Sequence, residues 1–393
     1  MRIAFLSYEF PPDTGVGGIA TYVRQIATLL SERKVGVEVI CASPHREETV
    51  QENEFLNITW IRCNSTEEFR KLSPVIAAKR HAENPVDMVE VPEYGAEGLH
   101  VKEHLPKLPL IVKLHTPKFL IKDLNDHYYN QINMRRIKSF IGLRYRRESD
   151  PEYKAIRYAD HILSPSRSLI DIVSHKWSIS RERILHAPNP YFPSKKLMDL
   201  SANPGSKTIL YIGRLETRKG VYNLAKAVPQ VVNAFPDARF VFLGKDSRGP
   251  YREHSMKKVM MKEMASVSVN VSFIDHVPLT EVHSVIAQSG ICIFPSLWEN
   301  FPNVCLEAMT AGRPIVASQE GGMRDMLEDI NGGVFIDPHN PQSIARGIIE
   351  LLSAEKFRHE AGERNREKAI EYYGKRLPNE LLNTYQSFLS KKG

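Results

Sequence analysis

The hydrophobic positions of this chain fall in short runs, not in long periodic stretches. Each run has the length of a strand and is apolar almost throughout, without alternating polar residues. Continuous apolar runs are typical of strands buried on both faces, as in parallel sheets. The runs that we expect to form strands are 2–7, 35–40, 86–91, 108–115, 159–166, 207–213, 238–244, 270–274, 290–296, 313–318 and 333–337.

Longer segments with helical spacing separate these runs. Residues 18–34 and 221–235 are examples, and Pro229 predicts a kink in the second. Strand and helix alternate in two series, which indicates an α/β chain with two domains.

The boundary between the two series is expected in a stretch rich in Pro, Ser, Lys and Asn, residues 187–207. We predict a first domain over residues 1–190, a linker over 191–204 and a second domain over 205–372. The last residues, 372–393, have the pattern of a helical tail. Ligands of open α/β sheets bind at the carboxyl ends of the strands, so a cleft between the domains is the expected site.

Composition agrees with a two-domain globular protein of 393 residues. No apolar run is long enough to span a membrane, and the first residues favour a buried strand over a secretory signal. The four cysteines form no CxxC pair, which favours buried thiols in a reducing cytoplasm over disulfides or a zinc ribbon. The net charge of +7 favours an anionic partner.

A glycine-rich turn follows the first expected strand. Gly15, Gly17 and Gly18 precede a helix, and such a turn lets a phosphate approach the backbone and the helix N-terminus. The eight residues of loop before the glycines do not match the dinucleotide fingerprint. A flexible loop without a ligand is an equally good interpretation.

A basic turn follows the strand 207–213. It carries Arg214, Arg218 and Lys219, and a planar Arg fork with a mobile Lys could neutralise a diphosphate. Taken alone, a solvated basic turn is the more common outcome.

Two glutamates, Glu299 and Glu307, lie in the segment 296–309. Pro302 suits the first turn of a helix and Gly312 its end, so Glu299 is expected on a loop and Glu307 inside the helix. The two carboxylates do not share a helical face, no His is adjacent, and the chain has no Asp-x-Asp. This pattern argues against a metal site. Solvated or salt-bridged carboxylates remain alternatives at this point.

These segments together resemble the retaining nucleotide-sugar glycosyltransferases of family 4. The resemblance is carried by residues 294–327, by 213–220, and by short matches at 14–18, 114–117 and 187–190, in the family's order and over nearly the whole chain. It implies the GT-B fold, with two Rossmann-like domains facing across a cleft. It also implies that the C-terminal helix, about 375–393, returns to the first domain.

The resemblance also implies roles for single residues. Glu299 and His115 would lie near the reacting carbon of the donor sugar, as the catalytic candidates. Glu307 would bind the ribose and the base would stack near 273–278. The remaining donor-binding candidates are Arg214 and Lys219 at the diphosphate, Gly17 and Gly18 from the other domain, and the backbone of Phe301, Pro302, Asn303 and Val304 at a helix start.

The implied reaction is sugar transfer from a nucleotide sugar to an acceptor hydroxyl, with retained configuration and without a metal or other cofactor. A UDP-sugar is favoured over a GDP-sugar as donor. The acceptor would be a glycan or glycolipid in surface polysaccharide assembly. A sugar-nucleotide 2-epimerase of the same fold and a non-catalytic nucleotide-sugar binding protein are the alternatives. An NAD-dependent oxidoreductase agrees least, because the fingerprint is absent.

A basic segment at residues 132–150 has three interpretations. Six cations lie between residues 135 and 147 without an acid, with apolar residues interleaved: Arg135, Arg136, Lys138, Arg144, Arg146 and Arg147. An ordinary helix of the first domain is one interpretation, an anionic membrane surface the second, and an anionic acceptor the third. No nucleic-acid motif accompanies the charges. The expected location is the cytoplasm, with contact to its membrane face as a second hypothesis.

Overall fold

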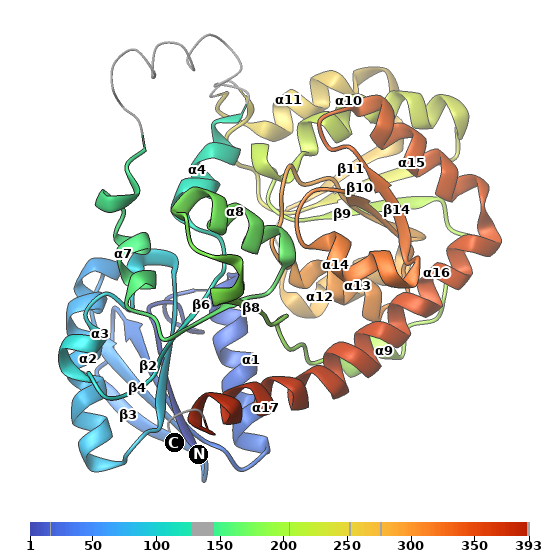
Figure 1. Cartoon of the computed structure of the whole chain (residues 1–393). Coiled ribbons are helices and arrows are strands. Elements are labelled where there is room, and N and C mark those ends of the chain that lie inside the picture. Colours follow the sequence, from blue (N-terminus) through green and yellow to red (C-terminus); the bar gives the residue numbers. More distant parts are fainter. Residues whose placement is uncertain (16, 128–144, 204, 251–252, 276, 391–393) are drawn as a thin grey trace. The chain divides into compact units, whose positions relative to one another are not determined.

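The computed structural model describes residues 1–15, 17–127, 145–203, 205–250, 253–275 and 277–390 (Figure 1). The chain divides into two compact units. The first comprises Met1–Lys118, Tyr145–Pro190 and Lys375–Gly393, and the second Phe119–Arg144 and Tyr191–Gly374.

The first unit is built on an eight-stranded sheet in the order β3-β4-β2-β1-β5-β6-β7-β8. All neighbours are parallel except β3 and β4. The strands are β1 (Arg2–Ser7), β2 (Gly36–Ser43), β3 (Glu48–Asn53), β4 (Leu56–Arg62), β5 (Met88–Pro92), β6 (Leu110–Lys113), β7 (His161–Ser164) and β8 (Ile184–His186).

Three of these strands were not expected from the hydrophobic pattern: β3, β4 and β8. Every residue of β3 is exposed, and β3 pairs antiparallel with β4 at the edge of the sheet. An exposed edge strand needs no apolar run, so the pattern gave no signal for it. The expectation of strands buried on both faces therefore fails at this edge.

Helices surround the first sheet on both faces (Figure 1). The helix α1 begins at Gly18, directly after the glycine-rich turn, and buries an apolar face that includes Ile19, Val23 and Ile26. The helices of this unit are α1 (Gly18–Glu32), α2 (Thr66–Glu83), α3 (Val101–His104), α7 (Pro151–Arg157), α8 (Arg167–Trp177) and α17 (Leu377–Ser390). The helix α4 (Lys118–Asn125) begins at Lys118 in the first unit, and its other residues belong to the second unit.

A buried polar network fixes α17 to the first unit. The Glu90 carboxylate on β5 accepts hydrogen bonds from the hydroxyls of Tyr22 on α1 and Tyr385 on α17, both at 2.7 Å. Lys113, at the end of β6, donates to the backbone oxygen of Ala187. Burial raises the pKa of Glu90 and lowers the pKa of Lys113 to about 8. A buried network of this kind is stable only when each group has a partner.

The second unit contains a six-stranded parallel sheet in the order β11-β10-β9-β12-β13-β14. Its apolar runs match the expected strands. The strands are β9 (Thr208–Ile212), β10 (Arg239–Leu243), β11 (Val271–Ile274), β12 (Ile291–Phe294), β13 (Ile315–Ser318) and β14 (Gly333–Ile336).

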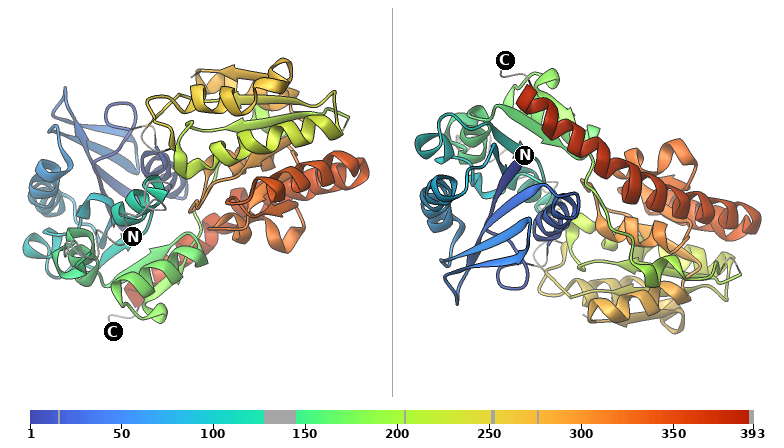
Figure 2. Two further views of the ribbon diagram at one scale, coloured as in Figure 1. Left: turned by 90° about the horizontal axis from the view of Figure 1, so that it is seen from above. Right: turned by 90° about the horizontal axis from the view of Figure 1, so that it is seen from below.

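Helices cover both faces of the second sheet (Figure 2). On one face, α10 packs with α11 and α15 over a core that includes Leu224, Val228 and Ile348. Pro229 lies within α10. The helices are α9 (Lys195–Met198), α10 (Val221–Ala234), α11 (Met256–Glu263), α12 (Leu279–Gln288), α13 (Asn303–Thr310), α14 (Met323–Leu327), α15 (Pro341–Ser353) and α16 (Glu355–Glu367), the last followed by a π-helical stretch, Lys368–Arg376. Among the described residues, no helix is both long and apolar enough to cross a membrane.

Candidate functional site

A cluster of charges lies beyond the carboxyl ends of β9 and β12 in the second unit. Lys219 and Arg218 both face the carboxylate of Glu299. The Lys219 ammonium pairs with Oε2 of Glu299, and the Arg218 Nη1 lies 3.7 Å from Oε1. Glu216 is 2.8 Å from Arg218 Nε and 3.3 Å from the exposed Arg214. The structure thus brings together four residues named from two separate sequence segments: Arg214, Arg218, Lys219 and Glu299.

Two glycines let the loops of this cluster approach each other closely. Gly220 has φ +69°, and a Cβ there would lie 1.8 Å from the backbone oxygen of Pro295. Gly321 has φ +89°, and a Cβ would lie 2.1 Å from the backbone oxygen of Glu299. Both positions therefore need glycine for conformation and for space. The Gly322 N–H also donates to the Glu299 oxygen at 2.8 Å, which fixes the backbone of Glu299.

The cations decide the charge state of Glu299. Burial alone would raise the pKa of Glu299, but Lys219 and Arg218 outweigh burial and bring this pKa below its ordinary value. Burial lowers the pKa of Lys219, and Glu299 opposes that shift. Ser296 donates a further hydrogen bond to Oε2 at 3.3 Å. Three cations and two carboxylates leave one net positive charge, which suits an anionic ligand.

The helix α13 begins four residues after Glu299 and contains Glu307. The sequence predicted Pro302 in the first turn of this helix. The helix begins at Asn303, so Pro302 is instead its N-cap. Pro302 has no N–H, so a contact with the donor there would not be a donated backbone hydrogen bond, and its place in the donor site stays a prediction. The Cys305 N–H donates to the Pro302 oxygen.

Other features of α13 follow the sequence closely. The ring of Phe301 is buried and packs edge-on against Tyr373, with 5.6 Å between centroids. Glu307 lies inside the helix, where burial raises its pKa to about 7. Gly312 follows the helix with φ +65°, two residues after its last residue Thr310.

In the first unit, the glycine-rich turn surrounds a carboxylate that sequence reasoning missed. A Cβ on Gly15 would lie 3.0 Å from Cβ of Glu9, and one on Gly17 would lie 3.2 Å from its Oε2. Gly17 is the N-cap of α1, while a Cβ on Gly18 would meet nothing within 4 Å. Burial raises the pKa of Glu9, and the Ala20 N–H opposes this shift. The helix start that was expected to receive a phosphate thus already faces a carboxylate.

His115 lies just after β6 and is buried. Its backbone N–H donates to Glu93 at 2.7 Å, and its ring packs edge-on against Tyr22 with 5.3 Å between centroids. Burial and the nearby Lys113 lower the pKa of His115 to about 3. The ring is therefore neutral near pH 7 and can act through hydrogen bonds, not as a cationic acid.

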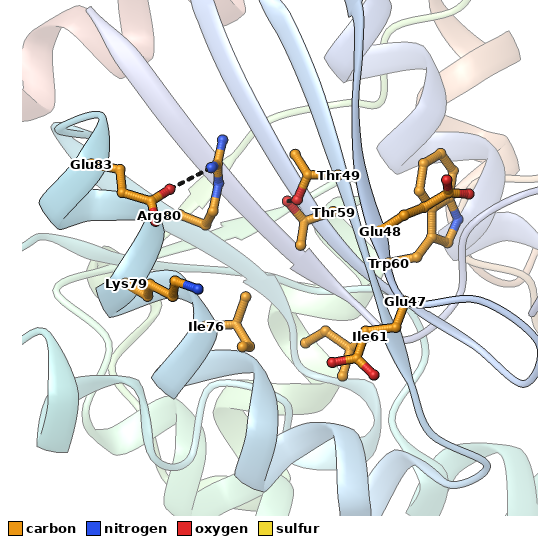
Figure 3. A pocket seen from close by; sticks show the side chains of 10 residues that line it. All are labelled: Glu47, Glu48, Thr49, Thr59, Trp60, Ile61, Ile76, Lys79, Arg80 and Glu83. Carbon is orange, nitrogen blue, oxygen red and sulfur yellow. Dashed lines mark hydrogen bonds and ion pairs between the residues drawn. The ribbon is translucent and has the colours of Figure 1, made fainter.

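A separate pocket of about 230 Å³ lies at the edge of the first sheet (Figure 3). Arg80 there is already paired with Glu83 and Glu38. The volume is below the range of roughly 300–1,000 Å³ typical of small-molecule sites. The residues that line the pocket come from β3, β4 and α2, apart from Glu47, which directly precedes β3. None was a site candidate: Glu47, Glu48, Thr49, Thr59, Trp60, Ile61, Ile76, Lys79, Arg80 and Glu83.

Part of the basic segment lies outside the described residues, including Arg135, Arg136, Lys138 and Arg144. Arg147 is described and donates to the backbone oxygen of Trp177 at 3.0 Å. Among the described residues, no group of three or more His, Cys, Asp or Glu is arranged to hold a metal.

Two family models match the chain and together cover residues 16–368. The model described as "Glycosyltransferase Family 4" matches residues 16–194, and the model described as "Glycosyl transferases group 1" matches residues 195–368.

The chain also resembles curated proteins, with 23% to 31% identity over the aligned residues. The spore coat protein SA of Bacillus subtilis (strain 168) is 31% identical over 185 residues, which are 46% of this chain and 49% of that protein. An uncharacterized glycosyltransferase of Methanocaldococcus jannaschii is 23% identical over 421 aligned positions that cover 100% of both chains. A D-inositol 3-phosphate glycosyltransferase of Corynebacterium glutamicum (strain R) is 25% identical over 92% of this chain and 91% of its own length. The chain thus spans about half of the first relative and nearly all of the other two.

Solved structures confirm the fold. A sucrose-phosphate synthase from Thermosynechococcus elongatus matches 100% of both chains with a TM-score of 0.72 and 16% identity. The Anabaena protein HepE, in complex with UDP, covers 98% of this chain with a TM-score of 0.69 and 16% identity, and is itself covered over 100% of its length. The expected GT-B class, with two Rossmann-like domains on parallel sheets, is confirmed.

Proposed function

The chain belongs to glycosyltransferase family 4, and on this basis we propose that it transfers a sugar from a nucleoside diphosphate sugar to an acceptor hydroxyl. Configuration at the reacting carbon would be retained, and no metal would be needed. The acceptor would be a glycan or glycolipid, in assembly of a surface polysaccharide at the cytoplasmic side of a membrane.

The observation that carries this proposal is the cluster at Glu299. Two cations converge on one carboxylate at the carboxyl ends of two parallel strands, which is where open α/β sheets bind ligands. When a sugar leaves its nucleotide, negative charge builds on the diphosphate. Fixed cations stabilise that charge without a metal. Arg214 is exposed and has the reach for such a ligand, and Lys219 is the second candidate.

The same contacts support an orienting role for Glu299. A carboxylate with a cation on each oxygen is stabilised as an anion and is a weak nucleophile. We therefore favour direct attack by the acceptor oxygen from the side of the leaving group. The new carbon–oxygen bond forms as the bond to the diphosphate breaks, and the acceptor proton passes to the departing phosphate oxygen. Glu299 would orient the sugar and stabilise its positive charge.

The remaining candidates keep the roles that the family resemblance suggests. Glu307 would accept hydrogen bonds from the ribose, and the Asn303 and Val304 amides would donate to the ligand. Gly17 and Gly18 would let a phosphate approach the backbone. His115, neutral near pH 7, would contact the transferred sugar through a hydrogen bond. UDP-sugars are the first donors to test, because HepE was solved with UDP.

Release of nucleoside diphosphate from a panel of UDP- and GDP-sugars in EDTA tests the proposal. The wild type should release the nucleoside diphosphate, with water or a glycan as acceptor of the sugar. Lys219→Ala should abolish release and Glu299→Ala should lower it strongly. An epimerised donor without release of the nucleoside diphosphate would instead identify a sugar-nucleotide 2-epimerase. Binding of the donor without any turnover would identify a binding protein.

A further inference from the structure

Arg218 is the most enclosed cation of the cluster. Its side chain is 14% exposed, against 17% for Lys219 and 61% for Arg214. One edge of its guanidinium faces Glu216, with Nε 2.8 Å from Oε1, and Nη1 faces Glu299. A planar guanidinium can face two carboxylates at once, which a single ammonium does less well. Arg218 thus links the loop after β9 to the loop after β12.

Glu216 is a fixed anchor for this link. It is buried, and its neighbour Leu215 donates its N–H to the Lys245 oxygen at 2.9 Å. The hydroxyl of Tyr211 donates to the Arg214 oxygen at 2.8 Å, which fixes the same turn from the other side. The roles proposed above for sugar and diphosphate leave both Glu216 and Arg218 without a task.

The task follows from a competition for Lys219. Without a ligand, Lys219 pairs with Glu299, yet Lys219 is also the proposed diphosphate ligand. A bound donor carries two phosphate charges and would draw the ammonium toward itself. Glu299 would then lose the cation on Oε2, and a largely enclosed carboxylate without a partner is costly. A second cation that the donor does not capture would avoid this loss.

We propose that Arg218 is this second cation: a positioning residue, anchored by Glu216, that keeps Glu299 ionised and in place while the donor holds Lys219. The inference rests on the proposed function and adds to it a division of roles. Arg214 and Lys219 bind phosphate, whereas Arg218 serves the carboxylate.

The test compares Arg218→Gln with Arg214→Gln in two measurements. The first is the Kd for UDP by calorimetry, and the second is kcat for UDP release at saturating donor from pH 4.5 to 8. In Arg218→Gln, Kd should stay within about 3-fold of wild type while kcat falls about 30-fold or more. The acid limb of its kcat profile should move up by about one pH unit or more, because Glu299 loses a cation. Arg214→Gln should weaken UDP binding without moving that limb.

The groups around Glu299 make this pH readout specific. Lys219, Arg218 and Ser296 contact its carboxylate, and Tyr211 and Glu216 lie nearby. Arg218→Lys keeps the positive charge but lacks the planar guanidinium, so its acid limb should lie between those of wild type and Arg218→Gln. Glu216→Gln should shift the limb in the same direction as Arg218→Gln, because the anchor is lost.

The exposed Arg346→Gln on α15 is the matched control for the loss of an arginine and should behave as wild type. If Arg218→Gln fails to fold by thermal melting, Arg218→Lys and Glu216→Gln carry the test. An acid limb that stays at its wild-type pH in Arg218→Gln and in Glu216→Gln, or UDP binding weakened as much as in Arg214→Gln, would overturn the inference. Failure of the wild type to release a nucleoside diphosphate from any donor would instead overturn the proposed function.

Discussion

Glu307 should couple donor binding to the release of a proton. Burial places the pKa of this carboxyl at about 7, against about 4.3 for an exposed glutamate. Ribose hydroxyls donate hydrogen bonds best to the ionised form, which accepts through both oxygens. With that pKa, roughly one tenth of the free protein is ionised at pH 6 and roughly nine tenths at pH 8. If only the ionised form binds, the donor should bind about 10-fold more weakly at pH 6 than at pH 8, which is a loss of about 1.4 kcal/mol in binding free energy.

The assay is calorimetric titration with a UDP-sugar at pH 6, 7 and 8. Both phosphates of such a donor are esterified, so the ligand does not titrate in this range. At pH 7, buffers of different ionisation enthalpy should reveal release of about half a proton per bound donor. The variant Glu307→Gln is the control: it should bind more weakly and lose this pH dependence. If Kd changes equally with pH in wild type and in the variant, the assignment is refuted, because a group other than Glu307 would then release the proton.

Stability gives an independent check on Glu307. A carboxyl whose folded pKa exceeds its unfolded pKa binds more protons when folded, so its contribution to stability falls as pH rises between about 4.3 and about 7. Glu307→Gln should therefore melt at a higher temperature than wild type at pH 8 and at the same temperature at pH 4.

Three further predictions concern contacts elsewhere in the two units. Gly321→Ala should abolish diphosphate release, because its Cβ would meet the Glu299 oxygen at 2.1 Å, while Gly205→Ala, with open space around it, should change nothing; an active Gly321→Ala would contradict the packing argument. Glu9→Gln should tighten binding of a UDP-sugar by a factor of about 5, because a negative charge leaves the start of α1, and an unchanged Kd would exclude that role. Tyr385→Phe should lower the free energy of unfolding by about 1.5–3 kcal/mol in urea titrations, since the buried Glu90 loses a hydrogen bond, whereas the exposed Tyr158→Phe should be neutral.

The sequence predicted the second sheet far better than the edge of the first. All six strands of that sheet leave a hydrophobic run. β9 and β12 are largely buried, whereas β11 is partly exposed but still apolar. The exposed strand β3 leaves no such run. Its partner β4 is largely buried, but Asn57 and Thr59 interrupt its apolar residues, and it was missed as well. Periodicity reports burial, and it is silent where a strand is held only by backbone hydrogen bonds.

The candidate site was predictable only in part, for a similar reason. Motif spacing placed Glu299, Lys219 and Glu307 on the correct loops and helix, because their neighbours Gly220 and Gly312 end or begin local elements. It did not reveal Glu9, since its place beside Gly15 and Gly17 comes from how the turn folds. Side-chain pairs between distant segments leave no local signal.

The docking of α17 has a consequence for how the protein is made. The first unit contains residues from the start of the chain, yet it is completed by Lys375–Gly393. Until those last residues leave the ribosome, Glu90 lacks the Tyr385 hydroxyl, one of its two tyrosine partners. The first unit is therefore completed only after the second unit has been synthesised. A nascent chain that stops short of α17 would expose an incomplete first unit to chaperones and proteases.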